Sequence, residues 1–210
     1  MTGWAERQAE SLLERASAKA DGPPDFYTLW AASSPERQEQ LAALLAAHGL
    51  RLAQVGAWEV LAEFNPDADG WDAAVMEAWL TKAAESHAAQ YEQAGYAAAV
   101  DAVREDGDWR DNLRTGMAAW VTAGALRAAT AGTEALSFGS HDAAGASGLT
   151  RKIWRTGGRN PRASHKALDG ESVGLDDVFG NGLRWPGDGR GDADETAGCN
   201  CSLDYTREGG

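Results

Sequence analysis

The side chains that could do chemistry in this sequence lie near its C-terminal end: one histidine, His165, and the chain's two cysteines, Cys199 and Cys201. Imidazole and thiolate groups are the usual ligands of structural zinc, which takes four ligands in a tetrahedral arrangement. We therefore interpret these three residues as candidate metal ligands, and zinc as the candidate structural cofactor. The candidates for a fourth ligand are Asp169, Asp176 and Asp188.

The spacing of the two cysteines leaves a second interpretation open. A Cys-x-Cys pair is a weaker metal signal than Cys-x-x-Cys, whose longer spacer lets the chain wrap around the ion. A disulfide bond is disfavoured, because residues two apart on a strand share a face without the geometry of an unstrained bridge. The alternative is that His165 hydrogen-bonds an aspartate or a backbone carbonyl while both thiols pack against Trp185.

Catalytic motifs are not evident around these residues. Ser164 directly precedes His165, and neighbours in sequence do not thereby form a nucleophile–base pair. The Lys166-Ala167 that follows His165 lacks the glutamate of zinc deaminases. We expect no enzyme; the alternative is a metal-dependent enzyme or toxin-like effector built on His165, Cys199 and Cys201.

The charge distribution singles out the same part of the chain. The net charge of -13 disfavours nucleic-acid binding by the whole surface. Residues 149–167 nevertheless carry six basic side chains and no acidic one. This segment is either a salt-bridge partner for the acidic remainder or a contact for DNA phosphates or an acidic partner. The basic residues are Arg151, Lys152, Arg155, Arg159, Arg162 and Lys166.

The first part of the chain, residues 1–131, predicts helices. Apolar residues recur at three- and four-residue steps, and proline or glycine separates the segments. A serine cap with proline at the first helical position starts the second helix, and Gly49 is interpreted as its C-terminal stop. No apolar run is long enough to span a bilayer. The expected helices cover residues 3–20, 35–48, 50–64, 71–105 and 108–130.

The composition changes near residue 132, since 16 of the 25 glycines lie from there onward. Residues 132–148 are rich in glycine, alanine and serine and predict a linker. Residues 149–205 predict a small α+β module with many turns: a strand over 149–156, a short helix over 162–167 that Asn160-Pro161 would start, and a second strand after the Asp169-Gly170 turn. Residues 206–210 are expected to be a flexible tail. The predicted fold class is α+β, mainly helical with a turn-rich C-terminal module that contains short strands.

The order of motifs over residues 108–205 resembles the phage Mu F-like minor head protein family, also called phage head morphogenesis proteins. The resemblance rests on residues of the C-terminal module, and it departs from the family's pattern where Gly157-Gly158-Arg159 replaces an acidic residue and where Asn200 replaces a basic one. The residues that carry it are Lys152, Trp154, Arg162, Ser164, His165, Leu168, Asp169, Gly170, Phe179, Pro186, Gly187, Asp188, Cys199 and Cys201; Trp185 stands beside Pro186 in the same stretch.

The resemblance implies a virion protein of a tailed double-stranded DNA phage or prophage. Such proteins are minor capsid components inside the head that associate with the portal protein and support head assembly, DNA packaging or DNA delivery. The implied location is the phage head near the portal, and the host cytoplasm during assembly. The implied partners are the portal, the head interior and packaged DNA, with no membrane. A further alternative is a helical interaction module of a prophage with a degenerate C-terminal part.

Overall fold

The computed structural model describes residues 1–18, 22–68 and 73–207 of the chain. It is mainly helical and ends in a small three-stranded antiparallel sheet, so the predicted fold class is confirmed. The chain forms two compact units, each made of two stretches: unit 1 is Met1–Leu45 with Ala84–Ala128, and unit 2 is Ala46–Ala83 with Ala129–Gly210. Three long helices contribute residues to both units.

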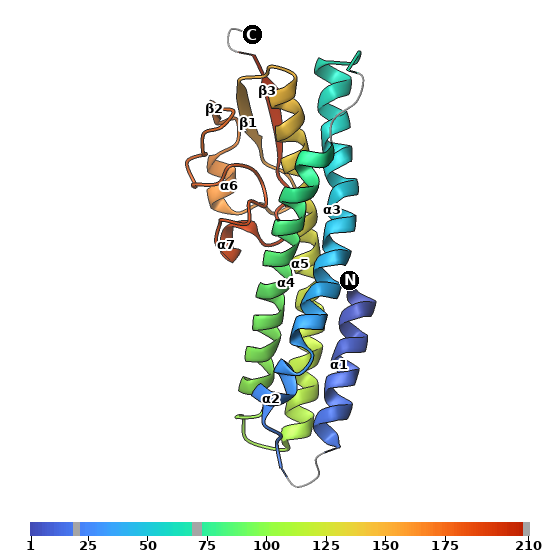
Figure 1. Ribbon diagram of the computed structural model, residues 1–210. Helices are drawn as coiled ribbons and strands as arrows, with labels where there is room; N and C mark the ends of the chain where they lie inside the picture. The colour runs from blue at the N-terminus through green and yellow to red at the C-terminus, as the bar shows by residue number, and fades with distance from the viewer. Residues whose placement is uncertain (19–21, 69–72, 208–210) are drawn as a thin grey trace. The chain divides into compact units, whose positions relative to one another are not determined.

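Unit 1 is all helical (Figure 1). Pro23 and Pro24 separate its first two helices, and Asp25 caps the second by accepting from the backbone N–H groups of Tyr27 and Thr28. That short second helix was not predicted. The helices of the unit are α1 (Thr2–Ser17), α2 (Phe26–Ala31) and parts of α3 (Ser34–Phe64), α4 (Ala73–Ala102) and α5 (Trp109–Ala146).

The core of unit 1 combines aromatic rings with one buried ion pair. Trp120 packs against Trp4 and Trp30 with ring centroids 6.5 and 5.5 Å apart. Arg37 and Glu92 are 2% and 1% exposed and meet at 2.7 Å, so neither charge is left unpaired in the interior. Trp4, Trp30 and Trp120 are thus core residues, each at most 6% exposed.

Two helix boundaries differ from the prediction, and in both cases a glycine lies inside a long helix. Residues 35–48 and 50–64 form the single helix α3, in which a Cβ at Gly49 would lie 3.4 Å from Leu80 and 3.5 Å from Ala135. Residues 132–146, predicted as a linker, belong to α5. A Cβ at Gly139 would lie 2.0 Å from the Ala53 carbonyl oxygen, so this glycine lets the backbones of α3 and α5 touch. The end of the helix expected over residues 3–20 and the start of the one expected over residues 71–105 lie outside the described residues.

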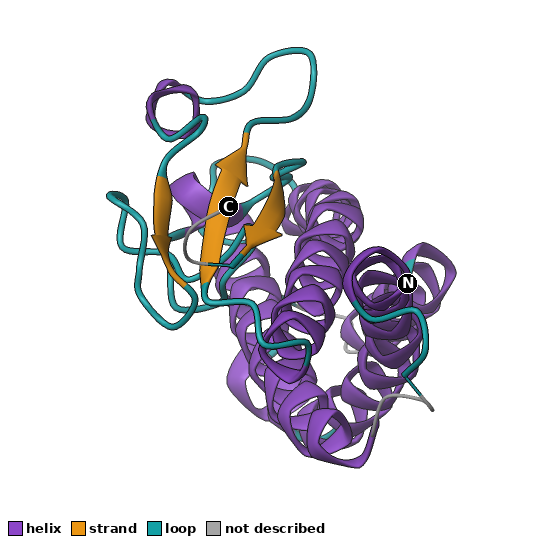
Figure 2. Cartoon of the chain, turned by 90° about the horizontal axis from the view of Figure 1, so that it is seen from above, coloured by secondary structure: helices purple, strands orange, loops and turns teal. Residues whose placement is uncertain are grey.

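The C-terminal module belongs to unit 2. Its sheet has the order β2-β1-β3, with β1 (Arg151–Arg155) between β2 (Ser172–Gly174) and β3 (Ser202–Thr206), both antiparallel to it. Figure 2 shows the three strands side by side. Two short helices, α6 (Ala163–Ala167) and α7 (Ala193–Thr196), lie in the connections. The predicted strand and short helix are present, but the N-cap of α6 is Arg162 rather than Asn160, and the expected tail begins inside β3.

The module is attached to α5 by hydrogen bonds that satisfy loop backbone groups. Thr133 donates to the carbonyl of Cys199 at 3.0 Å, and Glu134 accepts from the N–H of Gly189 at 2.6 Å. Trp185 packs against Phe138 of α5 with ring centroids 5.6 Å apart. The segment predicted as a linker is therefore the helical surface on which the module rests.

Candidate functional site

The module is built around a small core that gathers the motif residues. Trp154 reaches this core from the middle strand, where alternate residues point to the same face, and it is fully buried. Phe179 packs edge-on against Trp154 with centroids 5.1 Å apart. The thiols therefore pack near Trp154. The alternative interpretation, which had them pack against Trp185, is wrong on this point. The buried members of the core are Trp154, Leu168, Phe179, Leu183, Cys199 and Cys201.

His165 of α6 lies with both cysteines at the edge of this core. Its Nδ1 is 3.5 Å from the sulfur of Cys199 and 3.4 Å from that of Cys201. The three side chains are 1%, 3% and 7% exposed, and their ligand atoms all lie within 4.8 Å of one another. Residues separated by more than thirty positions thus place two thiols and one imidazole nitrogen around a single point.

The two thiols are not equivalent. Cys199 and Cys201 share a hydrogen bond, which raises the pKa of Cys199 above its ordinary value and lowers that of Cys201. Burial opposes ionisation of both, while the backbone N–H of Gly157 helps to lower the pKa of Cys201. A Cβ at Gly157 would lie 2.0 Å from the carbonyl oxygen of Asn200. This glycine is therefore what allows the chain after β1 to approach the cysteine loop.

On the other side of the imidazole ring stands Glu195, which the sequence analysis did not single out. Its Oε2 lies 3.2 Å from the Nε2 of His165, close but not aligned as a hydrogen bond. Burial alone would raise the pKa of Glu195, but hydrogen bonds from Ser164 and Asn181 and the charge of His165 lower it. In the sequence alone, Glu195 is one of several acidic residues before Cys199, and no local pattern distinguishes it from the others.

The three aspartates predicted as a fourth ligand are engaged elsewhere. Asp188 is fully buried and held by Arg184 and Arg190, whose hydrogen bonds outweigh the effect of burial and lower its pKa to about 2. Asp169 accepts from the N–H of Thr156 at 2.8 Å. Asp176 is 97% exposed near His141. The described cluster thus offers three side chains that could hold a metal ion.

Other motif residues have structural positions. Gly170 has a φ of +82°, which favours glycine, and its N–H donates to the carbonyl of Trp154 at 2.9 Å. Ser164 is half-buried beside Glu195. Trp185 and Pro186 are buried in the stretch that leads to Asp188. These residues shape the turns and the core of the module.

The basic segment is divided by the fold. Lys152 is fully buried with its ammonium group 5.4 Å from the centre of the Phe179 ring, so from this position it cannot contact DNA as predicted. Arg155 pairs with Asp204 at 2.5 Å, and Arg162 donates to the carbonyl of Ala197.

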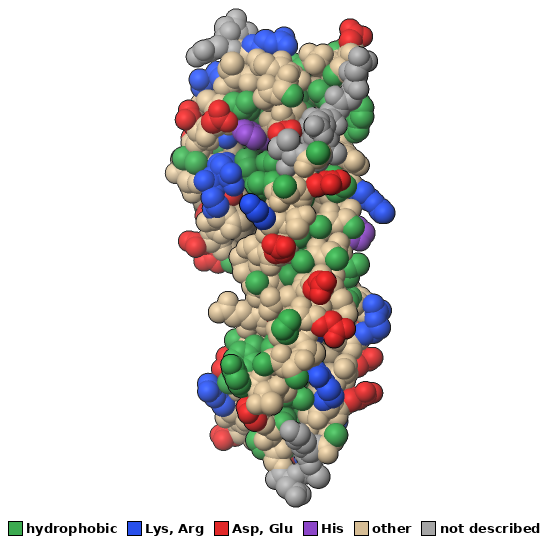
Figure 3. All heavy atoms as spheres, viewed as in Figure 1, with side chains coloured by type: hydrophobic (Ala, Val, Ile, Leu, Met, Phe, Trp, Pro, Cys, Tyr) green, Lys and Arg blue, Asp and Glu red, His purple; other side chains and the backbone are tan. Residues whose placement is uncertain are grey.

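The remaining cations of the segment have fewer contacts. The side chain of Arg151 hydrogen-bonds Ser172, whereas the side chains of Arg159 and Lys166 are exposed and make no hydrogen bond or ion pair within the described residues. On the face drawn in Figure 3, Lys and Arg side chains lie among Asp and Glu side chains. The segment is therefore partly an internal salt-bridge partner, and Arg159 and Lys166 are its free cations.

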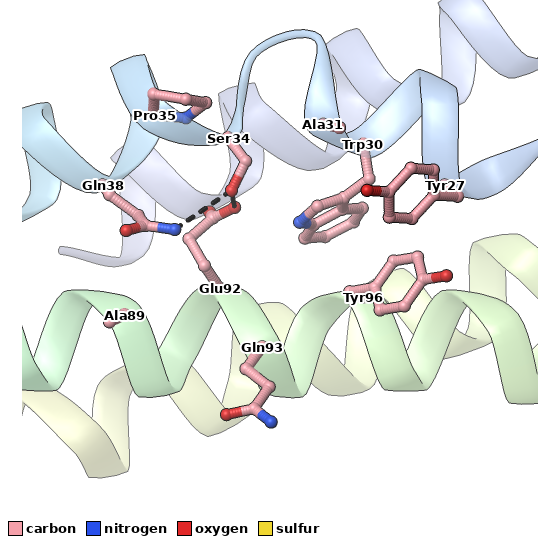
Figure 4. Close-up of a pocket in the computed structure, with 10 residues that line it drawn as sticks. All are labelled: Tyr27, Trp30, Ala31, Ser34, Pro35, Gln38, Ala89, Glu92, Gln93 and Tyr96. Atoms are coloured by element: carbon pink, nitrogen blue, oxygen red, sulfur yellow. Dashed lines mark hydrogen bonds between the residues drawn. The ribbon is translucent and has the colours of Figure 1, made fainter.

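Unit 1 contains a cavity of about 340 Å³ between α2, the start of α3 and α4. Figure 4 shows aromatic rings at one end and the side chains of Ser34, Gln38 and Glu92 turned toward one another at the other. Ser34 donates to Glu92 at 3.1 Å, and Arg37 neutralises the same carboxylate. The cavity thus offers apolar walls and a neutral polar end.

Fold and site together define a mainly helical protein with an α+β module that has a buried thiol–imidazole cluster at the edge of its core. Comparison with known protein families, with curated proteins and with solved structures finds no match to this chain. Among the described residues, no helix is both long and apolar enough to cross a membrane.

Proposed function

We propose that this chain is a minor head protein of a tailed double-stranded DNA phage or prophage, of the Mu F-like kind, that associates with the portal inside the head. The observation that carries the proposal is the gathering of its motif residues. Trp154, His165 and Phe179 meet the two cysteines in one core although they are spread over about fifty residues of sequence. A set of spaced residues that jointly builds a module is the kind of pattern that a shared fold leaves in a sequence.

The positions of these residues favour a structural role over catalysis. His165, Cys199 and Cys201 are almost completely buried, so the described residues around them shield their side chains from solvent. Active sites are usually concave and partly open pockets. The site therefore supports a module that holds its own fold and presents its surface to partners.

A surface for the portal is available on α3 within unit 2. Leu52, Val55 and Trp58 are 36%, 47% and 54% exposed and follow one another at three-residue steps, which places them on one side of the helix. Exposed apolar side chains that lie together mark interaction surfaces. We place the portal contact on this stripe.

Co-expression with the portal protein of the same phage or prophage tests the proposal. We expect a stable complex with a fixed ratio of this chain to the portal ring, measured by size-exclusion chromatography with light scattering. A chain that elutes alone at micromolar concentrations, while the portal forms its ring, would contradict a portal-associated role.

The second candidate function is a metal-dependent enzyme or effector built on the same three residues. What favours it is that three protein ligands leave one tetrahedral position open, as in catalytic zinc sites. This function requires an activity that disappears on replacing His165 while the portal complex still forms.

A further inference from the structure

We propose that His165, Cys199 and Cys201 form a zinc site that ties α6 to the loop before β3. The ligand atoms are Nδ1 of His165 and the two sulfur atoms. The proposal rests on the geometry of the site and is independent of any association with a portal.

The distances in the cluster match those of a zinc centre. Zinc lies about 2.3 Å from a cysteine sulfur and about 2.0 Å from a histidine nitrogen, so a tetrahedral ion separates the two atoms by about 3.6 Å. The observed separations from Nδ1 are 3.5 Å to Cys199 and 3.4 Å to Cys201. These two nitrogen–sulfur separations are therefore those expected around a bound zinc ion.

Hydrogen bonding to His165 can satisfy only one of the two sulfur atoms. An imidazole nitrogen has either one proton or one lone pair in the ring plane, yet both sulfur atoms lie within 3.5 Å of the same Nδ1, so the second sulfur is left with the Cys199–Cys201 hydrogen bond. A metal ion on the lone pair of His165 would satisfy Cys199 and Cys201 together.

The charge of the complex suits its burial. Two thiolates and a neutral imidazole balance the two positive charges of zinc, so no net charge is placed in an interior where an unpaired ion is costly. Zinc binds thiolates, so the thiol protons still present leave to solvent on binding. A neutral water molecule could complete the tetrahedron without altering this balance.

Glu195 is placed as the partner that orients the histidine. Histidine ligands of zinc commonly present their second ring N–H to a carboxylate, which fixes the tautomer and strengthens the ligand. With zinc on Nδ1 of His165, the proton must be on Nε2, which lies 3.2 Å from Glu195. Asn181 holds this carboxylate in turn, at 3.2 Å. Glu195 is thus a positioning residue rather than a ligand.

The experiment measures zinc in the purified full-length chain under reducing conditions. We expect one zinc per chain by mass spectrometry, and a visible spectrum typical of tetrahedral thiolate coordination when cobalt replaces it. The variants Cys199→Ser, Cys201→Ser and His165→Gln should each lose the metal. His48→Gln, which changes an exposed histidine of α3, should retain it. A folded, reduced wild-type chain that takes up neither zinc nor tetrahedral cobalt overturns the proposal.

Glu195→Gln separates a metal role from a purely structural one, because the ligands stay intact. We expect zinc affinity to fall by about 10- to 100-fold, as for other partners of metal-bound histidines, with an unchanged circular dichroism spectrum. Unchanged zinc affinity in this variant would show that Glu195 does not orient His165 toward a metal.

Discussion

Tyr91 and Trp120 each donate a side-chain hydrogen bond to the backbone carbonyl of the other. The hydroxyl of Tyr91 lies 2.8 Å from Trp120 O, and the indole Nε1 of Trp120 lies 3.0 Å from Tyr91 O. The two rings are stacked with centroids 4.7 Å apart. This pair joins α4 to α5 in unit 1. The indole ring of Trp120 lies so close to the α4 backbone that a Cβ at Gly95 would be 2.5 Å from its nitrogen.

Removing the hydroxyl in Tyr91→Phe should lower the free energy of unfolding by about 1 kcal/mol, because a buried hydrogen bond is lost while the stacking remains. Tyr27→Phe is the matched control, since Tyr27 is 70% exposed, and it should leave stability unchanged. Urea unfolding followed by tryptophan fluorescence measures both. Equal effects of the two substitutions would contradict the importance of the reciprocal pair.

Two glycines of α5 should respond to alanine with opposite signs. Gly139→Ala puts a methyl group 2.0 Å from the Ala53 carbonyl oxygen and should destabilise the chain by about 1–3 kcal/mol through overpacking. Gly145→Ala meets only Leu175, at 3.6 Å, and should raise stability by up to about 1 kcal/mol because alanine favours helix. Denaturant unfolding of both variants checks the signs. A stabilising Gly139→Ala would show that α3 and α5 are not in backbone contact there.

Lys152 should make stability depend on alkaline pH. Burial, with a smaller contribution from Arg184, lowers its pKa from 10.5 to about 8, although neighbouring aspartates act in the opposite direction. Between about pH 8 and 10.5 the unfolded chain binds the proton more readily than the folded one, so stability should rise with pH over this window. The groups that act on Lys152 are Asp176, Arg184, Asp177 and Asp188, and Lys152 in turn acts on His141.

The variant Lys152→Met isolates this contribution. It removes the buried ammonium, which has no hydrogen-bond partner, and keeps a side chain of similar length. We expect it to be more stable than the wild type at pH 7 and to lose part of the alkaline rise. If the two stability–pH curves run parallel from pH 7 to 10, the lysine is not titrating in the folded core.

DNA binding, which the basic segment of residues 149–167 predicts, should depend on Arg159 and Lys166. Both are exposed, so the double alanine variant should bind duplex DNA more weakly without a change in stability. The slope of log affinity against log salt should fall by about one for each phosphate contact removed. Lys82→Ala, which removes an exposed cation of α4, is the control. If the wild type, the double variant and Lys82→Ala bind DNA equally well, Arg159 and Lys166 do not contribute to DNA binding.

Portal association should depend on Trp58. Replacing this half-exposed ring by serine removes most of the apolar area of the stripe on α3, so the complex should dissociate faster. Tyr27→Ser, an exposed aromatic residue of unit 1, is the matched control. Surface plasmon resonance on immobilised portal rings compares the two, and equal dissociation rates would place the portal contact elsewhere.

Much of the architecture could be predicted from local patterns. The helical period of α4 and α5 and the stops at Pro23-Pro24 and Asn65-Pro66 depend on residues near one another in sequence. The alternation in β1 and the left-handed turn at Gly170 are local as well. Because these patterns are local, the sequence predicted the mainly helical class and the small sheet. Residue type alone was enough to choose His165, Cys199 and Cys201 as candidate metal ligands.

The tertiary structure decided what depends on distant contacts. Gly49 resembles a helix stop and Gly139 a linker residue locally, but both lie inside long helices. At Gly139 the missing side chain admits the backbone of α3, so packing outweighs the helix-breaking tendency of glycine. Lys152 resembles a surface cation until the strand turns it into the core. The distance from His165 to two sulfur atoms more than thirty residues away, and the position of Glu195 behind the ring, exist only once the module has folded.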